Sequence, residues 1–189
     1  MKDFDRVYKH YDNFMKFFSL YKLKEIKKSL NLTGNEVIVD IGGGTGKLGQ
    51  YLSDSCELIY ILDESDKMLS KVKGSEKIIP IVGDALNTDF ESNSIDVVIL
   101  SDVFHHIENQ IKLLNEIKRI LKNDGKLLIM DFEKNHFKTK LLILFEYFLF
   151  RKLYFKTKNE MINILTKNFK VNKVIDKGYY FIIVGENRC

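Results

Sequence analysis

A glycine-rich turn between a short apolar run and a helical stretch constrains the fold of this chain more than any other feature. The β-branched run Val37–Val39, typical of a buried parallel strand, leads into Asp40-Ile41-Gly42-Gly43-Gly44-Thr45-Gly46. Glycine is required where a backbone turns tightly and approaches a ligand with no Cβ in the way. A glycine turn that opens a helix also presents free N–H groups to a polar ligand. The segment therefore predicts a strand–turn–helix unit with a ligand site at the turn.

The residue that precedes the glycines bears on the kind of ligand. Asp40, Gly42, Gly44 and Gly46 form an acid-x-Gly-x-Gly-x-Gly pattern. A carboxylate at the first position repels a phosphate and suits a ligand with a cationic end. The competing interpretation is a dinucleotide fingerprint on Gly44, Gly46 and Gly49, and either glycine match is weak by itself. A purely structural turn would need fewer glycines than this segment holds.

Strand and helix patterns alternate along the chain, which favours a parallel sheet with helices on both faces. The predicted strands are 37–39, 58–62, 78–82, 95–100 and 127–130. An amphipathic helix is expected from Ile107 to Leu121, with Ile111, Leu114 and Ile117 on its apolar face. Later elements are helices over 136–156 and 158–165 and an antiparallel hairpin over 171–184 that turns at Lys177-Gly178.

Length and composition indicate one globular domain. The chain has 189 residues, 45% hydrophobic and 30% charged, with a net charge of +4 that is too mild to indicate nucleic acid. Cys56 and Cys189 form neither a disulfide framework nor a zinc motif. The start lacks an apolar signal core, and the run 141–150 is too short to span a membrane, so we expect a cytoplasmic protein. The expected parts are an N-terminal helical cap (1–35), a cofactor-binding core (36–133), a helical lid insertion (134–168) and a C-terminal hairpin (169–189).

Acids follow the second and third predicted strands, where open α/β sheets bind ligands. Asp63 ends the second strand and can accept hydrogen bonds from both hydroxyls of a ribose, and the adjacent Glu64 can share that role. Asp84, in Gly83-Asp84-Ala85, can accept from the amine of an adenine. The alternatives are a helix-capping acid for Asp63 and an ordinary turn acid for Asp84.

The fourth predicted strand ends in Ser101-Asp102-Val103-Phe104-His105-His106, which should line a reactive cleft. Asp102, His105 and His106 are the candidate catalytic residues, because an imidazole or carboxylate there can act as a general base or orient a substrate. The alternative is a histidine that caps the next helix or packs under a loop. The spacing shows no further ligands for a metal, so no metal site is expected.

Taken together, these segments resemble the motifs of the Rossmann-like (class I) S-adenosylmethionine-dependent methyltransferases, in order along residues 36 to about 133. The resemblance is closest to the small-molecule branch that includes ubiquinone and menaquinone biosynthesis enzymes. It rests on Val37 to Gly46, Asp63-Glu64-Ser65-Asp66-Lys67-Met68-Leu69, Gly83-Asp84-Ala85, Asp96 to Ser101 with His105-His106-Ile107, and Leu114 to Leu127.

The resemblance implies a doubly wound seven-stranded sheet, mostly parallel with an antiparallel last strand, and S-adenosyl-L-methionine as the cofactor. It also implies a role for each matching residue. Asp40 and the glycines would hold the methionine part, Asp63 the ribose, Met68 the adenine face, Asp84 and Ala85 the adenine edge, and Ser101 the methyl end.

Substrate contacts are expected in the parts that vary within this family. Tyr8, Tyr11 and Phe145 are the candidate substrate-binding residues, because an apolar, aromatic lid excludes water and favours a hydrophobic acceptor. The run 141–150 is apolar nearly all round, so it should be buried, contact a second copy in a homodimer or touch lipid. Lysines and arginine across 138–158 would suit a membrane surface, although a lid or dimer contact is favoured.

The sequence therefore predicts a methyltransferase that acts on a small, hydrophobic or aromatic acceptor. Two alternatives stay open: a non-catalytic S-adenosylmethionine-binding sensor and an NAD(P)-dependent oxidoreductase that uses Gly44, Gly46 and Gly49. Enzymes that methylate the exocyclic amine of a DNA base usually carry Asp/Asn-Pro-Pro-Tyr-like residues after the fourth strand. This chain has Ser101-Asp102-Val103-Phe104 there, so no nucleic-acid substrate is expected.

Overall fold

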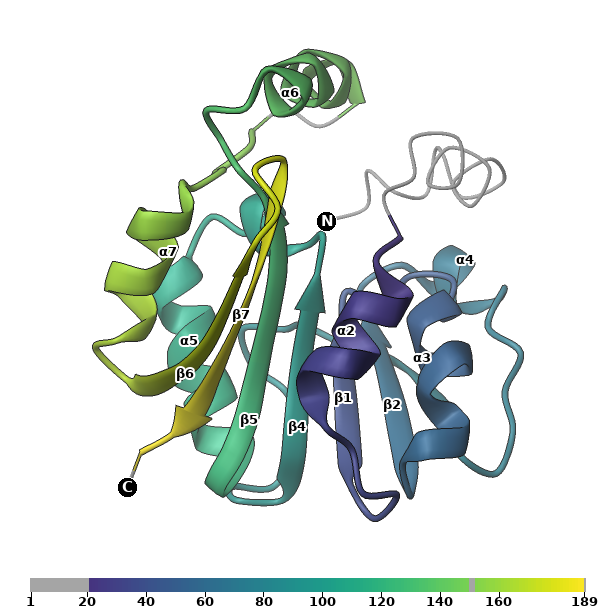
Figure 1. Ribbon diagram of the computed structural model, residues 1–189. Helices are drawn as coiled ribbons and strands as arrows, with labels where there is room; N and C mark the ends of the chain where they lie inside the picture. Colours follow the sequence, from purple (N-terminus) through teal and green to yellow (C-terminus); the bar gives the residue numbers. More distant parts are fainter. Residues whose placement is uncertain (1–20, 150–151, 189) are drawn as a thin grey trace.

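The computed structural model describes residues 21–149 and 152–188, apart from the side chains of Phe145, Phe148 and Leu149. These residues form one seven-stranded sheet with the strand order β3-β2-β1-β4-β5-β7-β6 (Figure 1). The strands are β1 (Val37–Ile41), β2 (Leu58–Asp63), β3 (Ile78–Val82), β4 (Ile95–Ser101), β5 (Leu121–Phe132), β6 (Phe169–Asp176) and β7 (Tyr180–Asn187).

The direction of each strand confirms the predicted doubly wound sheet. The pairs β1–β2, β2–β3, β1–β4 and β4–β5 are parallel. The last strand, β7, lies between β5 and β6 and is antiparallel to both. The hairpin turns at Lys177-Gly178 as predicted, with Gly178 at φ 72.

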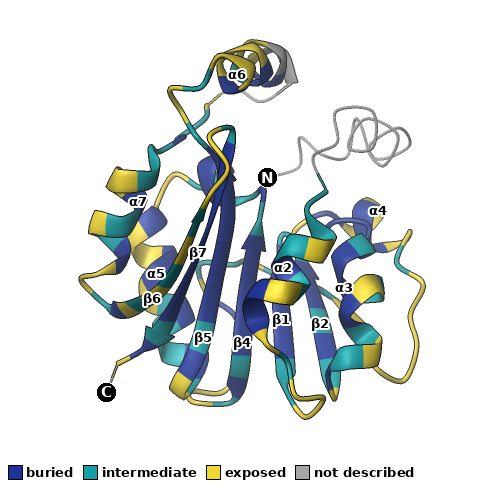
Figure 2. Ribbon diagram, in the orientation of Figure 1, coloured by how far each residue is buried: buried dark blue, intermediate teal, exposed yellow. Residues whose placement is uncertain are grey.

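Helices cover both faces of the sheet because successive strand residues point to opposite sides. Ile38 packs with the apolar side chains of α2 (Leu23–Leu30) and α3 (Lys47–Leu52), while the next residue, Val39, packs with α5 (Gln110–Ile120) and α7 (Lys158–Leu165). Figure 2 shows the sheet buried between these two layers. The continuous apolar run 37–39 is thus explained by two cores that share one strand.

The helix expected over 107–121 is shorter than predicted. Asn109 caps α5, since its side chain accepts a hydrogen bond from the Lys112 N–H at 3.0 Å, and the helix ends at Ile120. A short 3-10 helix, η3 (Phe104–His106), precedes it. Ile111 is 53% exposed, so its assignment to the apolar face was wrong. The buried face consists of Leu113, Leu114, Ile117 and Ile120.

The long helix predicted over 136–156 ends earlier. The structure has α6 (Phe137–Leu149), and residues 152–157 are not helical. The Tyr154 N–H donates to the His105 carbonyl at 2.6 Å instead of continuing a helix. Thr157 then forms a capping box with Glu160, which starts α7 at the predicted position.

The helix α6 lies beyond the carboxyl ends of the parallel strands, apart from both helix layers (Figure 1). Leu142 and Glu146 are buried, whereas Phe137, Leu141, Leu144 and Tyr147 are exposed. Of the three alternatives expected for this apolar segment, burial therefore applies to one side of the helix only. Within the described ranges, no helix combines the length and apolar content that a membrane span requires.

The strand β3 forms one edge of the sheet. It pairs with β2 on one side, and no other strand of the described residues pairs with its second side. Ile79 and Val82 are exposed along it, and Pro80 lies between them.

A polar network fixes the loop that follows β3 to α5. Thr88 donates from its N–H and its hydroxyl to Glu116 Oε1, at 2.8 and 2.7 Å. Arg119 donates to both oxygens of the same carboxylate, at 2.9 and 2.7 Å. These donors, the guanidinium above all, lower the pKa of Glu116 to about 2. The network holds the loop that begins at Gly83 against the core.

We expect Glu116→Gln to lower the free energy of unfolding by about 1–3 kcal/mol at neutral pH, because an amide cannot replace the charge-assisted bonds. The folded pKa lies below the ordinary value of 4.5. The stabilisation is therefore complete above that value and is lost as the pH falls towards 2. Urea unfolding at neutral pH and in acid measures the difference. Glu91→Gln, at an exposed acid of the same loop, serves as the control, and an equal loss in both variants contradicts the assignment.

Candidate functional site

The glycine turn is fixed to the end of β2 by backbone hydrogen bonds. The N–H groups of Gly42 and Gly43 donate to the Leu62 carbonyl, at 2.7 and 3.3 Å. Gly42 has φ 68, and a Cβ on it would lie 2.5 Å from Cγ2 of Val103. A Cβ on Gly43 would lie 2.8 Å from Oδ2 of Asp40. The turn therefore needs glycine both for its backbone conformation and for space.

Asp63 connects the glycine turn to the start of α4 (Asp66–Leu69). Its Oδ2 accepts from the Gly44 N–H and its Oδ1 from the Ser65 N–H, both at 2.9 Å. The Ser65 hydroxyl in turn accepts from the Met68 N–H at 3.1 Å and caps the helix. Asp63 thus positions the turn as well as facing the pocket beside it.

Two pockets lie on either side of the glycine turn and share Gly42 and Gly44. The larger has a volume of about 620 Å³ including its open mouth, and the smaller about 410 Å³. The larger is lined by Ile41, Gly42, Gly44, Leu62, Asp63, Glu64, Met68, Gly83, Ala85, Asp102, Val103, His106 and Ile107. The smaller is lined by Tyr21, Leu23, Asp40, Gly42, Gly43, Gly44, Thr45, Lys47, Leu48 and Ser101. Because these residues follow β1, β2, β3 and β4, the pockets occupy the carboxyl edge of the sheet, as expected for this class of fold.

Most of the predicted cofactor-binding residues line one of these pockets, but two do not. Gly46 caps α3 at φ 72. Asp84 is exposed, and its Oδ1 accepts from the Leu86 N–H at 2.8 Å. The local turn bond that was the alternative interpretation for Asp84 is therefore present.

Asp40 is a buried acid whose charge is not balanced by a contact in the described residues. It is 2% exposed, and its Oδ2 has no hydrogen-bond partner among them. Burial, together with the nearby Asp63 carboxylate, raises the pKa of Asp40 to about 8. A cationic group in the smaller pocket would restore the charge of this carboxylate.

The predicted catalytic residues lie together, but they do not face the pocket equally. Asp102 and His106 line the larger pocket. His105 is fully buried behind them, stacked on Phe155 with ring centroids 3.9 Å apart. Asp102 has φ 62, which turns the chain sharply after β4.

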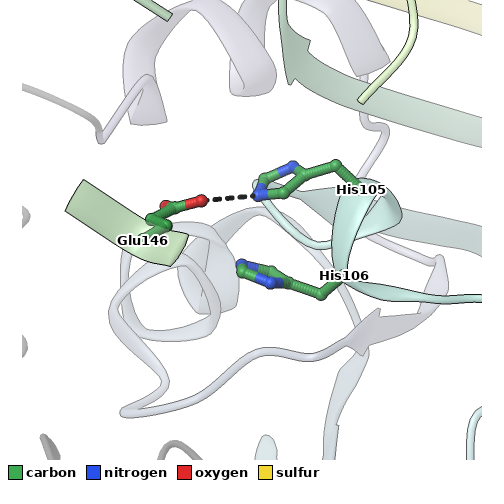
Figure 3. Close-up of side chains that lie close together, drawn as sticks. All are labelled: His105, His106 and Glu146. Carbon is green, nitrogen blue, oxygen red and sulfur yellow. Dashed lines mark ion pairs between the residues drawn. The ribbon is translucent and has the colours of Figure 1, made fainter. Parts of the chain in front are cut away.

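Two acids that the sequence analysis did not single out complete this cluster. Asp131 Oδ1 lies 2.8 Å from His105 Nδ1 and also accepts from the Phe132 N–H at 2.7 Å. Glu146 Oε2 lies 3.6 Å from His105 Nε2 (Figure 3). Asp131 lies at the end of β5. The search for acids at the carboxyl ends of the strands, which found Asp63, could therefore have found Asp131 as well. Glu146 is the one acid inside the apolar run 141–150, and an acid in such a run is a signal that could have marked it.

The two imidazoles of this cluster have opposite electrostatic character. Burial alone would lower the pKa of His105, but Asp131 and Glu146 outweigh burial and raise that pKa well above its ordinary value. Burial, with a contribution from His105, lowers the pKa of His106 well below its ordinary value. Burial raises the pKa of Asp102. At neutral pH the pocket wall therefore presents a neutral imidazole at His106.

The predicted substrate-binding residues cannot be placed. Tyr8 and Tyr11 lie outside the described residues. Phe145 belongs to α6, but its side chain is also outside the description.

Comparison with known proteins agrees with the site and the fold. Residues 39–129 match the family model of the methyltransferase domain. The chain is 31% identical over 141 residues to the demethylmenaquinone methyltransferase of Thermotoga maritima, which covers 69% of this chain and 60% of that protein. It is 31% identical over 170 residues to the phosphoethanolamine N-methyltransferase of Plasmodium falciparum, and this match covers 84% of this chain and 63% of that protein. The chain thus spans about three fifths of the length of these curated relatives.

The fold also resembles solved structures. One is a chain of the Haloferax volcanii complex between the Trm112 methyltransferase activator and a protein named as a methyltransferase. It has a TM-score of 0.87 and 17% identity, over 98% of each chain. A likeness at this identity supports the arrangement of strands and helices.

We expect Gly42→Ala to destabilise the protein more than Gly178→Ala. Both glycines have a positive φ, 68 and 72, but only Gly42 lacks space for a Cβ, since no atom of the described residues lies within 4 Å of a Cβ at Gly178. The control should cost about 1–2 kcal/mol for the backbone alone. Denaturant unfolding measures both losses. Val103→Ala in the Gly42→Ala background should recover part of the difference, and equal losses for both glycines would show that the contact with Val103 costs nothing.

Proposed function

Because the chain belongs to the Rossmann-like S-adenosylmethionine-dependent methyltransferases, we propose that it transfers a methyl group from S-adenosylmethionine to a small hydrophobic acceptor. One observation carries the proposal. Two pockets adjoin across a glycine turn at the carboxyl edge of the sheet, one beside Asp63 and Met68 and the other beside the buried Asp40. An elongated ligand that is apolar and nucleoside-like at one end and cationic at the other fits this pair.

The residues present fit the cofactor at each end. In the larger pocket, Asp63 and Glu64 stand where a ribose can donate to carboxylates, and Met68 and Ala85 provide an apolar wall for an adenine. In the smaller pocket, Oδ2 of Asp40, which accepts no hydrogen bond from the described residues, suits the amino group of the methionine part. Glycine at positions 42 and 43 lets the turn lie directly against Val103 and Asp40, because a Cβ at either position would come within 3 Å of these side chains. We propose no direct contact for Asp84 or Gly46.

When bound, S-adenosylmethionine supplies a methyl group on a good, neutral leaving group, so that the protein contributes mainly by positioning the acceptor. We assign that work to Asp102 and His106, which line the larger pocket. The low pKa of His106 keeps its imidazole neutral at pH 7, so that it faces the pocket without a charge. His105 lies behind this wall, so we assign it a positioning role rather than contact with the acceptor.

An apolar acceptor is supported by the surroundings of this wall. Val103 and Ile107 continue it with aliphatic side chains. Above it, α6 exposes Leu141, Leu144 and Tyr147 near the open end of the sheet (Figure 2). The demethylmenaquinone methyltransferase relative acts on an apolar molecule by its name, whereas the phosphoethanolamine N-methyltransferase relative acts on a charged one. The apolar lining favours the first kind.

Calorimetric titration of the cofactor-stripped protein with S-adenosylhomocysteine, with NADH as the comparison, tests the first part of the proposal. We expect micromolar binding of S-adenosylhomocysteine, about −8 kcal/mol, and none of NADH. Asp63→Asn should weaken the binding of S-adenosylhomocysteine at least tenfold, whereas Asp84→Asn should have little effect on it. Binding of NADH alone would overturn the proposal in favour of the dinucleotide interpretation of Gly44, Gly46 and Gly49.

Transfer of a labelled methyl group tests the second part. We expect transfer to reduced demethylmenaquinone to exceed transfer to phosphoethanolamine, because the described wall is apolar. The reverse order would contradict the acceptor class and leave the reaction type intact. Tight binding of S-adenosylhomocysteine without transfer to any member of an acceptor screen would favour a non-catalytic sensor.

The raised pKa of Asp40 predicts that binding releases a proton. In the free protein this pKa is about 8, so Asp40 is mostly protonated at pH 7. The ammonium group of S-adenosylhomocysteine favours the ionised form, so close to one proton should leave on binding, and the affinity should rise with pH up to about 8. Asp63, Lys47 and Tyr21 also face this region and stay unchanged in the test.

Calorimetry at pH 7 in two buffers of different ionisation enthalpy counts the released protons. The parent protein should show a buffer-dependent enthalpy, and Asp40→Asn should abolish that dependence. The same proton release in the variant would move the titrating group elsewhere.

A further inference from the structure

Five ionisable side chains converge under α6 behind the wall of the larger pocket. They are two imidazoles and three carboxylates, all at most 7% exposed: Asp102, His105, His106, Asp131 and Glu146. They come from the end of β4, from η3, from the end of β5 and from α6. An arrangement of three buried acids around two histidines carries more negative charge than its imidazoles can balance.

The orientation of His105 is set by Asp131. An ionised carboxylate only accepts, so the 2.8 Å contact with Asp131 Oδ1 places a proton on Nδ1 of His105. The other ring nitrogen, Nε2, then points to Glu146 (Figure 3). It also lies 4.0 Å from Asp102 Oδ1. Histidines that bind metals are held in this way, with the second ring nitrogen donating to a carboxylate.

The atoms around Nε2 of His105 are spaced as ligands rather than as hydrogen-bonding partners. Glu146 Oε2 lies 3.6 Å away and Asp102 Oδ1 4.0 Å away. Both separations exceed a good hydrogen bond. Ligands at about 2.1 Å from a tetrahedral ion lie about 3.4 Å apart. Asp102 Oδ1, His105 Nε2 and Glu146 Oε2 also have no hydrogen-bond partner among the described residues. Ligand atoms of His105, His106 and Glu146 all lie within 4.8 Å of one another.

We propose that this cluster binds one divalent first-row transition-metal ion, with His105 Nε2, the His106 imidazole and the Glu146 carboxylate as ligands. Asp102 is the fourth ligand, and Asp131 orients His105 without touching the ion. Mixed imidazole and carboxylate donors suit Zn²⁺, Co²⁺ or Fe²⁺ better than Mg²⁺, which prefers oxygen alone. The sequence spacing gave no such expectation, because Asp131 and Glu146 join the histidines only in the folded chain.

An ion at this place would tie α6 to η3 and to the end of β4. Glu146 is the ligand that α6 contributes, and Asp102 and His106 belong to the pocket wall. Metal binding would therefore fix α6 against the side chains that line the pocket wall. The site does not depend on the proposed methyl transfer, since it can be measured without cofactor or acceptor.

The test is direct titration of the chelator-treated, full-length protein with Zn²⁺ and Co²⁺, with Mg²⁺ as the comparison. We expect one Zn²⁺ or Co²⁺ per chain, a Co²⁺ absorption spectrum typical of four-coordinate nitrogen and oxygen ligands, and no Mg²⁺ binding at similar concentrations. Glu146→Gln keeps the shape of the side chain and should weaken binding at least tenfold. His136→Ala and Glu108→Gln, at a histidine and an acid outside the cluster, should bind as the parent does.

Hydrogen exchange provides a second measurement that also covers variants with altered folding. Zn²⁺ should slow the exchange of backbone amides in α6 of the parent protein, and Glu146→Gln should abolish that effect. The absence of stoichiometric binding by the parent, or equal binding by Glu146→Gln and the parent, would overturn the proposal. The cluster would then be an ion-paired anchor in which a protonated His105 takes the place of the metal.

Discussion

The site depends on the way in which two carboxylates are held on either side of one glycine turn. The turn is fixed to β2 by the Leu62 carbonyl and by Asp63, whose oxygens accept from Gly44 and Ser65. This arrangement brings Asp63 near the buried Asp40, and the two acids raise the free energy of the ligand-free site. A ligand that delivers hydroxyl donors to Asp63 and a cation to Asp40 relieves both. The same local geometry therefore explains why the turn needs glycine and why the ligand should be cationic at one end only.

The sequence predicted those parts of the fold and site that depend on local rules. The strand–turn–helix unit, the acids after parallel strands and the terminal hairpin follow from residue type and spacing, and the structure confirms the sheet they imply. Boundaries that depend on tertiary contacts were missed. Residues 152–157 are not helical, and the Tyr154 N–H donates to the His105 carbonyl. Ile111 lies on the exposed side of α5, whose buried face consists of Leu113, Leu114, Ile117 and Ile120. Asp84 follows a parallel strand, as a ligand-binding acid should, yet its carboxylate accepts a hydrogen bond from Leu86 within a local turn.

The cluster around His105 could not be predicted from spacing, since its acids are 26 and 41 residues away along the chain. Asp131 reaches it because β5 pairs with β4, which places Met130 opposite Ser101. Glu146 reaches it because α6 folds back over the carboxyl edge of the sheet. The helix α6 and the pocket wall thus meet through ionisable groups, while the outer side of α6 is apolar. Such a contact responds to a change of charge at the cluster more strongly than an apolar contact would.

The free edge of β3 has a consequence for the behaviour of the protein in concentrated solution. An edge strand with exposed Ile79 and Val82 could pair with the same strand of another molecule and start an aggregate. The only proline of the chain, Pro80, lies between them. The Lys77 carbonyl and the Gly83 N–H both form hydrogen bonds to β2. Because the backbone groups of successive strand residues point alternately to the two sides, the odd-numbered residues face β2 and the nitrogen of Pro80 faces the unpaired side. A strand of a second molecule that paired along this edge would find no N–H donor at Pro80. Pro80 thereby protects this edge against sheet extension.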